Sequence, residues 1–494
     1  MLPSNEPRYL NPILETRFDR ANLMIFEGLV GLDAQLEAVP RLAESWEVAA
    51  DGSTIKFRLR EGVRWHDGEP LIAEDVAFTI EALRETSAQT VWQGYMADVA
   101  EVKTPDDHTV IVEYDPPYAP ALKTWTMGIL PAHIYGDAED IRDSRGNREP
   151  VGTGPYRMAR WERGERIVLN ANERWWYEPD EDTGYGRPHL DTVELRLGVR
   201  NQLEALEELM IDFADVSNLS AWRQAQVSEF RENFEVSDVI ESRFRAIAWN
   251  GEREPFDQPE VRVALSHALN RGRVVEDVLL GQAQPLSAPF FPTMFGADRS
   301  LAPYPFDLDR AVNLLEDAGH PASGGDRFEI DLIMLERQSG ATADQTLAIF
   351  RRDLSAIGIR LRVRKLSTPE FFEAIGDRDY DAVYFGWLPD VPDPDPYPLL
   401  HSSQIGAGAN FAGVADEQMD ELLEQARQTA NRDERAALYR DLHARVHELE
   451  PYTVLYAPYG HYAWNRRVRG VNPADIGPQP LFPGVARWHI DPSH

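Results

Sequence analysis

Residues 330–365 read IDLIMLERQSGATADQTLAIFRRDLSAIGIRLRVRK, and this stretch indicates the fold of the second half of the chain. The apolar run at 330–335 predicts a buried strand. Residues 342–357 carry apolar side chains at helical spacing and stop at Gly358, a residue typical of helix ends. Residues 359–365 alternate between apolar and charged, as a half-buried strand does. A strand, a helix and a strand in this order predict a parallel pair with a covering helix.

Similar patterns lie on both sides of this unit. Further helices are predicted at residues 73–83, 259–271, 309–318, 415–429 and 432–449, and further strands at 54–59, 109–113 and 381–385. Because strands and helices alternate through the second half, we expect a mostly parallel sheet with helices packed over it.

Length and composition exclude several classes of protein. A chain of 494 residues predicts two or three domains. The net charge of −33 argues against nucleic acid as a partner, because phosphate binding needs a basic surface. The absence of cysteine excludes disulfides, thiolate metal sites and a cysteine nucleophile. The acidic, arginine-rich composition fits either a GC-rich genome or a salt-adapted organism.

Membrane and export signals are absent from the sequence as it stands. It has no run of 18 apolar residues, so we expect no membrane span. The first residues carry neither a basic segment nor an apolar segment of signal-peptide type. We therefore expect either a cytosolic protein or one whose leader is missing from this sequence.

The predicted strand at 381–385 ends in a conspicuous pair of side chains. Trp387 and Asp390 follow it, and Arg337 follows the strand at 330–335. In open α/β sheets, ligands collect outside the carboxyl ends of strands. A carboxylate can take an ammonium group and a guanidinium can take a carboxylate through its planar fork. Asp390 and Arg337 together indicate a site for a short zwitterion such as a small peptide. In the alternative interpretation, Asp390 caps a turn and Arg337 forms an ion pair at the surface.

Other motifs give weaker indications. His443 and His447 are four residues apart on a predicted helix, but residue 444 is alanine rather than the catalytic glutamate of a zinc protease. We expect a solvated helix face there. The prolines between Asp390 and Pro396 prevent a calcium-binding turn. No nucleophile elbow or convincing catalytic carboxylate pair is present. We therefore expect no cofactor, no metal and no enzyme activity.

Nearly the whole chain resembles a known family. The most specific segment is residues 40–76, which contain Trp65-His66-Asp67-Gly68 and end at Ala73-Glu74-Asp75-Val76. Further matches are Gly152-Thr153-Gly154-Pro155-Tyr156, residues 261–271, the 309–319 helix, residues 435–439 and residues 469–471. These segments resemble the peptide-type substrate-binding proteins of ABC transporters, the dipeptide, oligopeptide and nickel-binding group known as family 5. We expect the 65–68 motif itself to be a structural turn rather than a binding element.

The resemblance implies an α/β, two-lobed periplasmic-binding-protein type II (Venus-flytrap) fold. Lobe I would hold residues 1–250 and 464–494, with an accessory subdomain at about 34–188, and lobe II would hold 251–463. The chain would cross between the lobes near Trp249-Asn250 and Trp464-Asn465.

The resemblance also implies roles for particular residues. Asp390 stands where peptide-binding members hold the α-ammonium group of the ligand, and a gap-free count places Arg337 where dipeptide binders hold the carboxylate. Trp387 would pack against the ligand. Weaker candidates on segments that line the cleft in this family are Arg17, Phe18, Asn250 and Asn410.

The function that follows is capture of a short peptide or related zwitterion outside the cytoplasmic membrane, in the periplasm or attached to the membrane surface. The ligand would be delivered to an ABC permease, and we expect a monomer. The alternative is the same fold with an oligosaccharide, an opine or a nickel chelate as ligand. His401 is the nearest histidine for the nickel alternative.

Overall fold

The computed structural model describes residues 6–14, 20–88, 90–177, 187–216, 219–241, 243–292, 294–388, 395–406, 408–476 and 484–491. The chain forms two compact units. Unit 1 holds the described residues up to Val239 and from Gly460 onward, and unit 2 holds those from Ile240 to Tyr459. Within the described segments, no helix is both long enough and apolar enough to cross a lipid bilayer.

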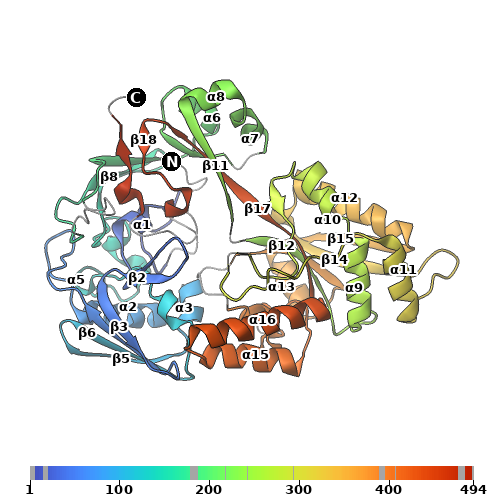
Figure 1. Ribbon diagram of the computed structural model, residues 1–494. Coiled ribbons are helices and arrows are strands. Elements are labelled where there is room, and N and C mark those ends of the chain that lie inside the picture. The colour runs from blue at the N-terminus through green and yellow to red at the C-terminus, as the bar shows by residue number, and fades with distance from the viewer. Residues whose placement is uncertain are drawn as a thin grey trace. The chain divides into compact units, whose positions relative to one another are not determined.

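Unit 2 is built on a sheet whose strands lie in the order β17, β12, β16, β14 and β15. Their bounds are Tyr452–Asn465 (β17), Phe244–Trp249 (β12), Ala382–Trp387 (β16), Phe328–Leu335 (β14) and Ile359–Leu366 (β15), and the short β13 (Ala283–Gln284) pairs with β17. The sheet and the helices around it are drawn in Figure 1. The predicted strands at 330–335, 359–365 and 381–385 are all present.

Helices cover both faces of this sheet. Alternate strand residues define the faces, since Ile247, Met334 and Tyr384 belong to one hydrophobic cluster and Phe244 and Phe385 to the other. Residues of α9 (Pro259–Ala268), α11 (Leu308–Asp317) and α12 (Ala341–Ala356) belong to the first cluster and cover that face. The second includes α13 (Thr368–Gly376), α15 (Glu417–Gln428) and α16 (Arg432–Leu449). Unit 2 is therefore a three-layer α/β/α structure, and its longer helices are close to the predicted ranges.

The helix ends follow local sequence rules. Asp307 caps α11 by accepting a hydrogen bond from the backbone N–H of Arg310 at 2.8 Å. Gly358 ends α12 with φ of 79°, a conformation that glycine adopts without steric cost. Short helical turns α10 (Arg271–Arg273), η3 (Val274–Val278), η4 (Glu336–Gln338), α14 (Tyr397–Leu400) and η5 (Ser402–Gln404) complete the unit.

The expectation of a mostly parallel sheet is wrong. β14 is parallel to β15 and to β16, but β12 is antiparallel to both β16 and β17. The βαβ rhythm extends only from β14 to β16, where helices supply the crossovers that parallel strands need. β12 follows directly after the first passage between units and β17 contains the second, and both lie outside the βαβ segment.

The passages between units lie inside β11 (Phe234–Ile240) and β17, at 239/240 and 459/460. The resemblance implied passages about ten and five residues later. β12 remains in unit 2 because it pairs along its whole length with β16.

Unit 1 contains several smaller sheets. A four-stranded antiparallel sheet has the order β3 (Ala43–Val48), β4 (Thr54–Leu59), β6 (Thr109–Tyr114) and β5 (Val99–Asp106). A three-stranded sheet joins β7 (Tyr156–Glu162), β8 (Arg166–Ala171) and β9 (Thr192–Arg196). The pairs β1–β2 (Val30–Leu32, Ala38–Pro40) and β18–β19 (Val468–Arg469, His489–Ile490) are separate, and β10 (Phe213–Asp215) pairs with residues 462–464 of β17.

The helices of unit 1 are short apart from α2 (Ala73–Glu85), which fulfils the prediction for 73–83. The others are α1 (Arg20–Ile25), α3 (Val91–Tyr95), α4 (Ala121–Thr124), α5 (Ala132–Tyr135), η1 (Ile141–Asp143), η2 (Arg145–Asn147), α6 (Gln202–Glu207), α7 (Leu219–Ala225), α8 (Ser228–Asn233), η6 (Pro473–Ile476) and η7 (Gly484–Arg487). Residues 34–188 contribute all of the four-stranded sheet and two strands of the three-stranded sheet. That these residues form a separate subdomain stays a prediction.

The 65–68 motif has the structural role that the sequence suggested. The backbone N–H of Gly152 donates to Nδ1 of His66 at 3.2 Å, and Nε2 of His66 lies 3.0 Å from the carbonyl oxygen of Gly154. The indole N–H of Trp65 donates to Asp75 at 3.2 Å. A Cβ at position 152 would lie 1.9 Å from the carbonyl oxygen of Ile25, so only glycine fits against α1 there.

The aromatic residues after β8 also have a structural role. The carboxylate of Glu27 is buried and accepts from the indole N–H groups of Trp175 at 3.3 Å and Trp176 at 2.8 Å. Arg41 donates to the same carboxylate at 3.1 Å. These contacts give the aromatic cluster a packing role inside unit 1.

We predict that protonation of His66 makes the fold less stable in acid. Burial lowers the pKa of His66 to about 4, whereas an unfolded histidine titrates near 6.5. Between these values the unfolded chain binds a proton that the folded chain excludes, so stability falls as pH decreases, by about 1.4 kcal/mol per pH unit.

The substitution His66→Gln removes this titration. Urea unfolding between pH 6 and 4.5 should show a shallower loss of stability in the variant than in the wild type. Above pH 7 the two stability curves should run parallel, with the variant lower because it lacks the hydrogen bonds to Gly152 and Gly154. Equal acid slopes in both proteins would contradict the assignment.

Candidate functional site

A pocket of about 410 Å³ lies in unit 2, at the carboxyl end of β16. The end of β16 contributes Gly386 and Trp387, and the start of β12 contributes Arg243 and Arg245. The remaining wall comes from the turn after β14, the first turn of α12, Leu279 and β17. A pocket of this size suits a small organic ligand.

Strand directions explain why these residues meet. β12 runs antiparallel to β16, so its register pairs Phe244 with Trp387 and Arg245 with Gly386. β14 runs parallel to β16, with Met334 opposite Tyr384. The turn after β14 therefore lies at the same edge of the sheet as the end of β16. The amino end of β12 and the carboxyl ends of β14 and β16 therefore meet at the pocket.

Arg245 occupies an unusual place in this wall. It lies on the sheet face that carries Ile247 and Tyr384, where the alternation of β12 would otherwise place an apolar residue. A Cβ on Gly386 would lie 2.5 Å from Nη1 of Arg245, so the guanidinium rests directly over the glycine backbone. Arg245 is half-buried, and no carboxylate among the described residues forms an ion pair with it.

Two tyrosines lie beside this guanidinium. The hydroxyls of Tyr384 and Tyr456 are hydrogen-bonded to each other. Burial raises the pKa of both phenols, so both are neutral near pH 7, and the positive charge of Arg245 opposes this rise. Arg243, at the pocket mouth, is exposed and forms an ion pair with Glu241.

The predicted site residues fall into different places. Trp387 is half-buried, packs against the second hydrophobic cluster of unit 2 and lines the pocket. Arg337 is exposed in the turn η4, and its neighbour Gln338 is the residue of that turn that lines the pocket. Asp390, Arg17 and Phe18 lie outside the described residues, so their roles stay predictions.

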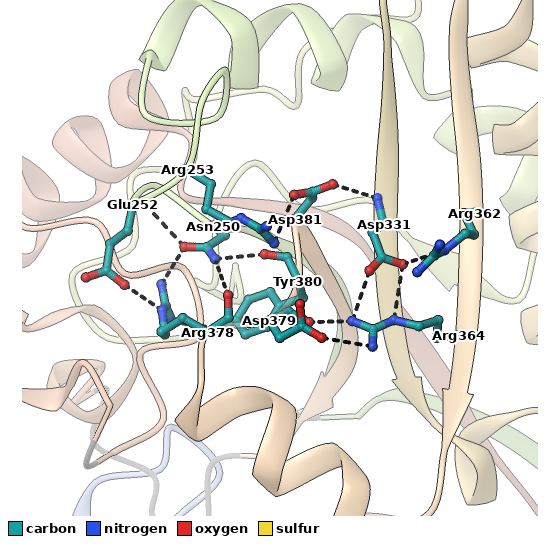
Figure 2. A network of polar contacts seen from close by, with 10 residues as sticks. All are labelled: Asn250, Glu252, Arg253, Asp331, Arg362, Arg364, Arg378, Asp379, Tyr380 and Asp381. Atoms are coloured by element: carbon teal, nitrogen blue, oxygen red, sulfur yellow. Dashed lines mark hydrogen bonds and ion pairs between the residues drawn. The ribbon is translucent and has the colours of Figure 1, made fainter.

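Asn250 lies at the opposite end of β16. The register pairs Trp249 with Ala382, five residues before Trp387, which corresponds to about 17 Å along a strand. Figure 2 shows the side chain of Asn250 among polar neighbours there. Its amide donates to the carbonyl oxygen of Tyr380 at 2.8 Å and accepts from Arg378 at 2.7 Å. The structure therefore does not bring Asn250 together with Trp387.

The rest of the network in Figure 2 joins β14 and β15 to the residues just before β16. The backbone N–H of Asp331 donates to Asp381 at 2.8 Å, and the carboxylate of Asp331 accepts from Arg362 and Arg364, each at 3.2 Å. Arg253 forms an ion pair with Asp381 at 3.4 Å. These groups satisfy each other, so the network stabilises this edge of the sheet.

Asn410 is likewise engaged inside unit 2. Its side-chain N–H groups donate to the carbonyl oxygens of Leu400 at 3.2 Å and His401 at 3.1 Å, and its oxygen accepts from the N–H of Gly413 at 3.0 Å. It is 2% exposed and does not line the pocket. Neither Asn250 nor Asn410 lines the pocket, and a ligand role for either residue stays a prediction.

The expectation of a solvated helix face at His443 and His447 is wrong. His443 is buried against Phe290, with ring centroids 4.6 Å apart, and lies 3.0 Å from the hydroxyl of Ser287. His447 stacks on Tyr304 at 4.3 Å. The two rings pack under the loop that follows β13, a contact that helical spacing does not reveal. In the described segments, no group of three or more His, Asp or Glu is placed to hold a metal ion.

Arg245 is the pocket residue that sequence reasoning missed. A signal was present, because the charged residue at 245 interrupts the apolar run 244–249, and a glycine interrupts the apolar residues of β16. The family resemblance directed attention to Asn250, at the carboxyl end of β12, whereas the antiparallel pairing brings the amino end of this strand to the pocket.

Known proteins share both sequence and fold with this chain. The family model described as bacterial extracellular solute-binding proteins, family 5 Middle, matches residues 37–408. Oligopeptide-binding protein AppA of Bacillus subtilis (strain 168) is 26% identical over 484 residues, covering 94% of this chain and 87% of the relative. Protein XP55 of Streptomyces lividans is 30% identical over 464 residues, covering 92% of this chain and 82% of the relative.

The solved structure of NikZ from Campylobacter jejuni in complex with Ni(L-His) has a TM-score of 0.76 to this chain. It is 24% identical and covers 99% of this chain and 98% of its own. The structure of AppA with a nonapeptide gives the same TM-score and the same coverage. These likenesses confirm the α/β, two-lobed type II fold class that the sequence predicted.

We predict that Asn250→Ala lowers stability without changing ligand affinity. Its amide bridges Tyr380 and Arg378, so the substitution leaves buried polar groups unpaired, at about 1–3 kcal/mol for each such group. Urea unfolding measures the first effect and calorimetric titration the second. A loss of affinity at unchanged stability would instead support the ligand role predicted from sequence.

Proposed function

Because the chain belongs to the bacterial extracellular solute-binding proteins of family 5, we propose that it captures a short peptide or related zwitterion for an ABC importer. The proposal places the protein outside the cytoplasmic membrane, in the periplasm or attached to the membrane surface. Its partners would be the ligand and a permease in the membrane, and the protein would act as a monomer. Its role would be binding and delivery, without catalysis.

The observation that carries the proposal is the pocket at the carboxyl end of β16, with Trp387 in its wall and a guanidinium beside it. An aromatic wall can pack against a peptide backbone or a first side chain, and a guanidinium binds a carboxylate. AppA, whose name describes an oligopeptide-binding protein, is similar over 94% of this chain. Asp390 follows Trp387 by three residues and is proposed to hold the ligand's ammonium group.

The alternative ligands are an oligosaccharide, an opine or a nickel chelate. NikZ, solved with Ni(L-His), has the same fold. His401, the nearest histidine for such a ligand, is buried, stacks on Tyr397 at 4.1 Å and lies 3.3 Å from Glu424. Its contacts are therefore internal to unit 2, and we favour the peptide.

We predict that di- or tripeptides raise the thermal unfolding temperature. A ligand at about 100 times its dissociation constant stabilises the folded protein by roughly 2.7 kcal/mol. A thermal-shift screen should compare a peptide mixture with oligosaccharides, opines and nickel–histidine. Native mass spectrometry of freshly purified protein would identify a ligand that co-purifies. A shift with one of the other classes and none with peptides would overturn the proposal.

We predict that Asp390→Ala weakens peptide binding strongly. Removing one partner of a desolvated charge pair costs about 2–5 kcal/mol, since the ligand's ammonium group loses its counter-charge. Asp317→Ala is the matched control, because Asp317 is an exposed aspartate at the end of α11 in the same unit. Calorimetric titration should show a loss of affinity for the first variant and none for the control. Unchanged affinity in Asp390→Ala would exclude the anchor.

A further inference from the structure

The pocket of unit 2 has a one-sided charge. Its wall includes the arginines at 243 and 245, and no aspartate or glutamate among the described residues lines it. This is unexpected in a chain with a net charge of −33 and 83 acidic residues. A cationic, partly desolvated wall favours an anionic group on whatever enters.

The two arginines differ in their availability. Arg243 is exposed and already paired with Glu241. Arg245 is half-buried, rests over Gly386 and has no ion pair within the part of the chain that the structure describes. Its neighbours are the neutral phenols of Tyr384 and Tyr456. A desolvated cation without a counter-ion is costly, so its position favours a ligand that supplies one.

A helix end adds to the same preference. Thr342 and Ala343, in the first turn of α12, line the pocket. The helix has 16 residues, and its N-cap, Gly340, offers no side chain to the free backbone N–H groups. The positive end of the helix dipole therefore lies close to the guanidinium, and both favour negative charge.

We propose that Arg245 binds the carboxylate of the ligand and thereby selects ligands that carry a free carboxylate beside an apolar or aromatic group. This inference rests on the proposed function and identifies a residue of the same site. It assigns the carboxylate to β12, instead of to Arg337 in the turn after β14. The apolar wall on the face of Arg245 comes from Leu279, Tyr384 and Tyr456. Trp387 lines the pocket from the other face of the sheet, since it lies opposite Phe244.

Gly386 is the positioning residue in this arrangement. The guanidinium can lie over β16 because position 386 has no side chain, and glycine is otherwise unfavourable inside a strand. An alanine there would displace the end of a flexible side chain and no backbone atom. The substitution should therefore move the charge while leaving the fold intact.

The test compares a mixture of di- and tripeptides with free C-termini and the same mixture with C-terminal amides. Native mass spectrometry identifies the peptides that bind. Calorimetric titration then measures their affinities for the wild type and for Arg245→Gln. The wild type should prefer the free acid over the amide by about 30-fold or more. Arg245→Gln should bind both forms with similar, weaker affinity, because the charge that distinguishes them is gone.

Two further variants separate a binding role from a structural one. Arg360→Gln is the matched control, since Arg360 lies at the start of β15, away from the pocket, and pairs with Glu329 at 3.5 Å. It should retain the wild-type preference for acids. Gly386→Ala should reduce the preference at a nearly unchanged unfolding temperature, although both arginines remain.

The possible outcomes are distinct. Binding of acids and amides with equal affinity by the wild type, or a full preference in Arg245→Gln, would overturn the inference and leave the proposed function standing. Binding of neither mixture by the wild type would overturn the proposed function and this inference with it. Loss of the preference in Arg337→Gln but not in Arg245→Gln would assign the carboxylate to the turn after β14.

Discussion

The antiparallel pairing of β12 with β16 is the constraint on which the pocket of unit 2 depends. In an antiparallel pair, the amino end of one strand meets the carboxyl end of the other. The register therefore brings Arg245 beside Gly386 and sends Asn250 about 17 Å away, to the polar network at the start of β16. Had β12 been parallel, the amide and the guanidinium would have exchanged ends, and the strand end at Trp387 would carry no half-buried cation.

Strand alternation gives the second part of the explanation. The two faces of the sheet are covered by different helices, so a one-residue change of register would move every side chain to the other layer. Apolar residues on both faces fix the register from position 246 to position 249. Arg245 follows the same alternation but lies at the pocket, which the first turn of α12 also lines, and Gly386 removes the side chain that would collide with the guanidinium. A charged residue can thus occupy a core-facing position without disturbing the core.

Local patterns predicted the longer helices and the strands β4, β6, β14, β15 and β16, because the causes of these elements are local. Asp307 and Gly358 set helix ends, and alternation marked the strands within one or two residues of their observed bounds. Strand direction is a non-local property, decided by which strands pair, and the single chain carried no direct signal for it. The site prediction shared this limit: Trp387 follows from its own strand, whereas Arg245 needed knowledge of a strand about 140 residues earlier. The buried packing of His443 depended on a loop equally distant in sequence.

The contrast between an acidic chain and a cationic pocket has a simple electrostatic resolution. At physiological ionic strength, charges separated by more than about 8 Å are largely screened when solvent lies between them. The many carboxylates on the surface therefore contribute little at the pocket. Arg245 acts at contact distance and in a partly desolvated wall, where an interaction between opposite charges is several times stronger than in water. The composition of the chain and the selectivity of its pocket are therefore set independently, and the net charge of −33 is compatible with an anionic group in the ligand.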